Sequence, residues 1–169
     1  MSISEEMRLD MIEKVREDSK NVSYPQTFDP TLYKDTNCMA YAIGARVPDL
    51  KHNFYVPGFI SGNANDLVVS RLVENFIEDM KVLGIHAEAI FRKEAMEINK
   101  EGYQVVGLFY SWLDQDFHFI RKDKEGGWSH KAGYKQEPRV IKYNYENFFE
   151  RDDCCITYDL IAFFNLSSL

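Results

Sequence analysis

The chain has 169 residues and a formal net charge of -7 at pH 7; 45% of the residues are hydrophobic and 28% are charged. This length and composition predict one globular domain over residues 1–169 with a sizeable core, and they exclude a largely disordered chain. The acidic balance, without a cluster of Lys and Arg, argues against nucleic acid as a partner.

The first fifteen residues, MSISEEMRLDMIEKV, carry acids and lack the continuous apolar core of a signal peptide. No apolar run approaches the length of a membrane span. We therefore expect a soluble, cytoplasmic protein without a membrane partner; release by another route stays open. The three cysteines, two of them adjacent, form no disulfide framework and no CxxC metal motif.

The N-terminal half of the chain is predicted to be helical. Residues 4–19 have the apolar spacing of an amphipathic helix, and residues 21–34, with two prolines, are expected to form a surface loop. A short helix is expected after Asn37. A longer helix, capped by Asn63 or Asn65, should run to Leu83 and end at Gly84.

The C-terminal half is predicted to be an antiparallel sheet. Strands are expected at residues 85–91 and 103–112, and residues 116–133 should form a hairpin with its turn at Asp123–Gly127. A short strand, a turn or short helix around Tyr145–Phe149, and a closing strand from about Cys155 to Phe164 complete the pattern. The expected fold class is α+β.

Cys38 is the first candidate for chemistry. It follows the run Asp35, Thr36, Asn37, any of which can cap a helix, so Cys38 is expected within the first helical turn. Unpaired amides and the helix dipole at that position favour a thiolate, which is the nucleophilic form of cysteine. The alternative is a buried cysteine with a packing role only.

His118 and His130 are twelve residues apart across the predicted turn. If the hairpin loop has an odd number of residues, for instance three ending at Gly126, both side chains point to one face of the sheet. If that face meets the start of the Cys38 helix, His118 can act as general base while His130 orients it. Either histidine could instead be structural.

The backbone N–H of Cys38 would lie near a developing oxyanion. The side chain of Asn37, Gln26, Tyr33 or Tyr24 could complete that site, and the sequence does not choose among them. Cys38, His118 and His130 could also bind zinc, but the paired spacing common in zinc sites is missing, so no metal is expected.

Three segments, NCMAYAIG, DFHFIR and GGWSHKAG, together resemble papain-like bacterial and phage thiol peptidases. The order Cys, His, His, with the histidines a dozen residues apart, is similar to the NlpC-type cell-wall peptidases and amidases. The resemblance implies a papain-like fold and assigns Cys38 as nucleophile, His118 as base and His130 as orienting residue. The D-C-S-G context usual around the nucleophile is replaced by Asn37-Cys38-Met39-Ala40.

Two functions follow as hypotheses. The first is a cysteine peptidase or amidase without cofactor, which cleaves an amide or peptide bond, a cell-wall peptide among them, through an acyl-enzyme on Cys38. A transamidase or deamidase would use the same residues. The second is a catalytically idle papain-like domain that binds a peptide or protein partner in the same cleft.

Overall fold

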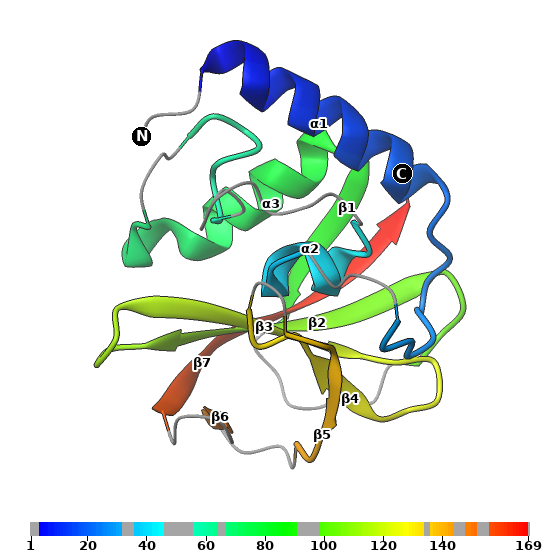
Figure 1. Cartoon of the computed structure of the whole chain (residues 1–169), viewed down its shortest axis with the longest axis vertical. Coiled ribbons are helices and arrows are strands. Elements are labelled where there is room, and N and C mark those ends of the chain that lie inside the picture. Colours follow the sequence, from blue (N-terminus) through cyan, green and yellow to red (C-terminus); the bar gives the residue numbers. More distant parts are fainter. Residues whose placement is uncertain are drawn as a thin grey trace.

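The computed structural model of the chain describes residues 4–31, 36–45, 56–63, 67–90, 99–133, 136–143, 148–151 and 156–168. Three helices, α1 (Glu5–Lys20), α2 (Cys38–Ile43) and α3 (Leu72–Val82), lie on one side of an antiparallel sheet (Figure 1). A 3-10 turn, η1 (Val69–Arg71), precedes α3. The α+β class predicted from the sequence is confirmed, with the helices first and the strands after them.

Among the described residues, the sheet has seven strands. They are β1 (Ile85–Ile90), β2 (Tyr103–Ser111), β3 (Asp116–Lys122), β4 (Trp128–His130), β5 (Arg139–Ile141), β6 (Phe148–Arg151) and β7 (Ile156–Ser168). The order across the sheet is β1-β7-β2-β3-β4-β5, and β6 pairs with β7 beside this path. Every described pairing is antiparallel.

Each face of the sheet carries its own apolar core, because side chains alternate between faces along a strand. On the helix-covered face, Leu108 and Phe119 are directly opposite each other and belong to the core that α1, α2 and α3 complete. On the other face, Phe109, Ile120, Trp128, Phe149 and Tyr158 gather in a second cluster under the β6–β7 hairpin. We call the first the helix face and the second the aromatic face.

The long N-terminal helix follows its prediction closely. α1 begins at Glu5, where the Ser4 hydroxyl accepts the amide of Met7 at 3.2 Å and caps the helix. Its buried residues are Met11, Ile12 and Val15. These three residues form the apolar stripe of the helix and pack in the helix-face core.

The start predicted for the third helix is wrong. α3 begins at Leu72, and the Asn63 amide instead closes a loop by donating to Gly58 O at 2.9 Å. Asn65 lies outside the described residues. The buried carboxylate of Asp79 accepts the amides of Gly58 at 2.7 Å and Ser61 at 2.8 Å, so this loop is fastened to α3.

Two strand predictions also change. Around Tyr145–Phe149 a turn or short helix was expected, but the described backbone from Phe148 onward is strand β6, held by pairing of Phe149 with Tyr158. β7 continues past Phe164 to Ser168, because β1 pairs with it there. Cys155 lies outside the described residues.

Candidate functional site

Cys38 is the first residue of α2, as the sequence predicts. Of the three expected capping residues, Asn37 is the N-cap, and its side-chain oxygen accepts the Ala40 amide at 2.9 Å. The helix ends at Gly44, whose φ of 82° is the left-handed conformation that glycine adopts readily. All six helical residues are buried, and Cys38 belongs to the helix-face core.

Tyr41, one helical turn after Cys38, fixes α2 to the β3–β4 hairpin. Its hydroxyl lies 2.6 Å from the hydroxyl of Ser129 on β4. The guanidinium of Arg121 on β3 lies over the Tyr41 ring, 4.0 Å from its centroid, and donates to the Tyr41 carbonyl at 3.1 Å. Tyr41 is therefore held by a cation–π interaction and by hydrogen bonds, and all three residues are buried from solvent.

Arg121 is fully buried, and its guanidinium N–H groups donate to several partners. It forms an ion pair with Asp123 at 2.9 Å and donates to the side chain of Gln26 at 2.8 Å and the carbonyl of Thr27 at 3.2 Å. Burial raises the pKa of Asp123 above its usual value, against the opposing effect of Arg121 and a hydrogen bond with Ser129. A buried cation with this many partners holds neighbouring segments in one arrangement.

The expected oxyanion groups are dispersed. The Tyr24 hydroxyl donates to Ile43 O at 3.0 Å and the Gln26 amide donates to Ala42 O at 3.1 Å, so both lie at the end of α2 remote from Cys38. Asn37 acts as the helix cap. Tyr33 lies outside the described residues, as do Cys154 and Cys155.

The two histidines are brought together. Nε2 of His118 lies 2.8 Å from Nδ1 of His130, and the rings meet edge to face with centroids 5.0 Å apart. His130 is directly opposite Ile120, so both histidines point to one face. The odd loop that this requires is confirmed: Asp123 N donates to Gly127 O, and Gly126 closes the three residues between them with a φ of 94°.

The histidines lie among aromatic side chains and are almost fully buried. The Phe149 ring stacks on His118 at a centroid distance of 5.3 Å and contacts the edge of His130 at 5.1 Å. The ring centroids of Tyr158 and His118 are 5.5 Å apart. The partner of His118 across the sheet is Phe109. All three neighbours belong to the aromatic face.

Cys38 and the histidines are therefore on opposite sides of the sheet. On β3, Phe117 and Phe119 point to the helix face, whereas His118 between them points to the aromatic face. The hypothesis that the histidine-bearing face meets the start of α2 is wrong for this structure. The catalytic roles of Cys38, His118 and His130 stay predictions.

Metal ligands do not cluster in the described part of the chain. No group of three or more His, Cys, Asp or Glu residues there is placed to hold a metal ion. Zinc binding by Cys38, His118 and His130 would also require ligands on both faces of a sheet to converge, which their placement does not allow. Among the same residues, no helix is long and apolar enough to cross a membrane.

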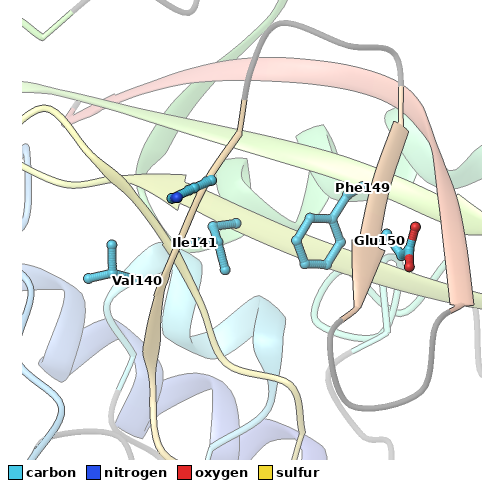
Figure 2. Close-up of a pocket in the computed structure, with 5 residues that line it drawn as sticks. Val140, Ile141, Phe149 and Glu150 are labelled. Carbon is cyan, nitrogen blue, oxygen red and sulfur yellow. The ribbon is translucent and has the colours of Figure 1, made fainter.

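A cavity of about 300 Å³ lies between β5 and β6 (Figure 2). Ile141 from β5 and Phe149 from β6 extend into the space between the two strands. Val140, Lys142 and Glu150 complete its lining, so apolar side chains stand beside one positive and one negative charge. Phe149 thus contacts the cavity on one side and both histidines on the other.

Comparison with known proteins yields no relatives: no family model matches the chain, and neither the curated proteins nor the solved structures contain a match.

Sequence reasoning overlooked the residues that hold the site together. Tyr41, Arg121 and Ser129 all occur in the three segments that carry the resemblance, yet they were not singled out. The signal was available in Arg121, because a charged residue on a strand that also carries two Phe and one Ile needs a buried partner if it points inward. The sequence does not reveal which distant residues supply that partner.

Proposed function

We propose that this chain is an idle papain-like domain of NlpC type, which binds a peptide or protein partner and does not use a Cys-His-His triad. The observation that carries the proposal is the placement of Cys38 and His118 on opposite faces of one sheet. The papain-like assignment is supported by a helix that begins with the cysteine and packs on antiparallel strands.

The physical argument for an idle site is the reach of a general base. A general base must come within hydrogen-bond reach of the group it deprotonates, about 2.6–3.2 Å directly or through one water. Here Phe117 and Phe119 occupy the side of β3 that faces the helices. The Nε2 atom of His118 is committed to His130 beneath the stacked ring of Phe149.

A binding role is supported by the cavity between β5 and β6. Recognition sites are concave, largely apolar and provided with a few polar groups that orient the bound molecule. Ile141 and Phe149 supply the apolar surface, and Lys142 and Glu150 supply the charges. The cavity lies between two strands of the sheet (Figure 2).

The second candidate is the cysteine hydrolase, and one observation favours it. Cys38 begins a helix that Asn37 caps. The contacts of Tyr41 with Arg121 fix this helix to strand β3, and such an attachment would hold a nucleophile rigidly. In that function the thiolate adds to an amide carbonyl, the amine leaves with a proton, and water releases the acyl group. A base other than His118 would then be required.

Thiol reactivity distinguishes the two functions. The rate of Cys38 alkylation by iodoacetamide is measured against pH in the native protein and in His118→Ala, with peptide mapping to separate the cysteines. We expect a slow reaction that rises only toward the pKa of an ordinary thiol, about 8.5, and the same profile in His118→Ala. Fast alkylation at lower pH that disappears in His118→Ala would establish the thiolate–imidazolium pair and overturn the proposal.

Binding itself is tested by selecting phage-displayed random peptides on the immobilised protein. We expect a recurrent sequence whose synthetic peptide binds the protein saturably in solution. If selection repeatedly yields no shared sequence and no saturable binder, the protein does not recognise peptides in this way and the binding function fails.

A further inference from the structure

β5 and β6 are both edge strands in the described structure. β5 is the last strand of the sheet and pairs with β4 alone among the described strands. Asp159 of β7 pairs with Tyr110 of β2 and with Phe148 of β6, so β6 lies on the other side of β7 from β2. Each strand therefore presents one edge of backbone N–H and C=O groups that no described strand covers.

The cavity joins these two edges. Its lining comes from the last two residues of β5, from Lys142 directly after them and from two adjacent residues of β6, and Figure 2 shows the strands on either side of it. Ile141 and Trp128 are directly opposite each other across β5 and β4. Ile141 thus shares the aromatic face with Phe149, and an apolar floor continues from one strand to the other.

We propose that an extended peptide segment occupies the space between β5 and β6 as an added strand, with one apolar side chain against Ile141 and Phe149. This inference rests on the proposed binding function and names its site and the form of its ligand. An extended backbone offers N–H and C=O groups on both of its sides, which suits a cavity with an edge strand on each side among the described strands.

The charges beside the cavity indicate which side chains the bound peptide should carry. Lys142 directly follows β5, and Glu150 lies on β6 with its side chain directed away from Phe149 (Figure 2), so the two strands carry opposite charges beside the apolar floor. An acidic residue in the peptide beside Lys142 and a basic residue beside Glu150 complete the pairing, with the apolar residue between them. The strands have three and four residues, which limits the core of the recognised segment to about four residues.

Helical ligands fit this site poorly. An α-helix satisfies its own backbone hydrogen bonds and is about 10–12 Å wide with its side chains. It would leave the groups of both strand edges unpaired. An extended segment satisfies them, and its alternate side chains point to the aromatic face and away from it.

The test uses the peptide selected on the native protein, labelled with fluorescein and measured by anisotropy. Ile141→Asp places a charge on the cavity floor, and Lys142→Glu reverses an exposed charge without touching the core. We expect Ile141→Asp to weaken binding at least about tenfold, or about 1.4 kcal/mol. Lys142→Glu should weaken it several-fold. The matched control Leu113→Asp, at an exposed apolar residue of the β2–β3 turn, should leave the affinity unchanged.

Backbone pairing has its own measurement. Peptides N-methylated at alternate residues should lose binding, and hydrogen exchange should slow at the amides of β5 and β6 when the unmethylated peptide is bound. If a peptide binds but Ile141→Asp and Lys142→Glu keep full affinity, or protection appears elsewhere, the site is wrong while the binding function stands. Dimerisation that Ile141→Asp abolishes and the peptide does not inhibit would assign the site to a second copy of the chain and overturn the proposal.

Discussion

His118 and His130 share a hydrogen bond of 2.8 Å between Nε2 of one ring and Nδ1 of the other, and Phe149 contacts both rings. One nitrogen must donate and the other accept, so each ring fixes the tautomer of the other. The pair lies in the second apolar cluster, where an unsatisfied ring nitrogen would be costly. This geometry gives the two histidines a shared structural role on the aromatic face.

The histidine pair should show strong coupling in stability. His118→Phe or His130→Phe alone leaves the remaining ring without this partner, so we expect each to lower the free energy of unfolding by about 1–3 kcal/mol. The double variant should lose less than the sum of the two, because the unsatisfied group is removed. Urea unfolding of the four proteins measures this. Additive losses would show that the hydrogen bond contributes nothing to stability.

Arg121 and Asp123 provide a second prediction. Arg121→Met removes the cation and leaves the Asp123 carboxylate buried, so we expect a loss of about 3–5 kcal/mol in the free energy of unfolding. Adding Asp123→Leu should recover a large part of that loss. Lys14→Met, which removes the exposed pair with Asp10, should cost less than about 1 kcal/mol. A small effect of Arg121→Met would contradict the role assigned to this ion pair.

The cap of α2 is testable at Asn37. Asn37→Ala removes the acceptor for the Ala40 amide, and we expect a loss of about 1 kcal/mol with faster hydrogen exchange at that amide. Asn37→Asp keeps an acceptor and should retain most of the protection. Urea unfolding and exchange monitored by NMR measure both effects. If Asn37→Ala leaves the Ala40 amide protected, another group caps the helix.

Stability should depend on pH through Asp79. Burial raises the pKa of its carboxyl from 3.8 to about 6, although the amides of Gly58 and Ser61 and the charge of Arg8 oppose the shift. The folded state therefore holds a proton that the unfolded chain has already lost between these values. The stabilisation from this group is complete below about pH 4 and is lost as the pH rises through 6, by about 3 kcal/mol at most.

Asp79→Asn separates this contribution from those of other acids. The variant cannot ionise at that position, so the difference in unfolding free energy between it and the native protein should change over pH 4–7. Urea unfolding at several pH values gives the comparison. A constant difference over the whole range would show that Asp79 does not titrate there.

Local features were well predicted from the sequence. A helix start after the run Asp35–Asn37 followed from the acceptor chemistry of these side chains, although the sequence did not choose the cap among them. The shared face of the histidines was one of two parity cases, and the loop ending at Gly126 is the odd one. Both depend on residues near in sequence. The start of α3 was missed because the Asn63 amide bonds to Gly58 and Asp79 fastens the same loop, and such partners are not visible locally.

The relation between Cys38 and His118 could not be predicted for a different reason. Parity determines which residues share a face but not which face a helix will cover. In DFHFIR both alternating sets contain apolar residues: Phe117 and Phe119 point one way, and His118 and Ile120 the other. Either face could have received α2. The choice depends on Tyr41, whose contacts with Ser129 and Arg121 span 88 and 80 residues.

Those long spans have a consequence for the nascent chain. A helix of six residues is too short to persist alone in water, and α2 depends on a hairpin synthesised much later. We therefore expect the segment around Cys38 to leave the ribosome unfolded and to dock only after the β3–β4 hairpin has formed. In that case the Cys38 thiol, which is buried in the folded protein, becomes protected from solvent only when the hairpin is complete.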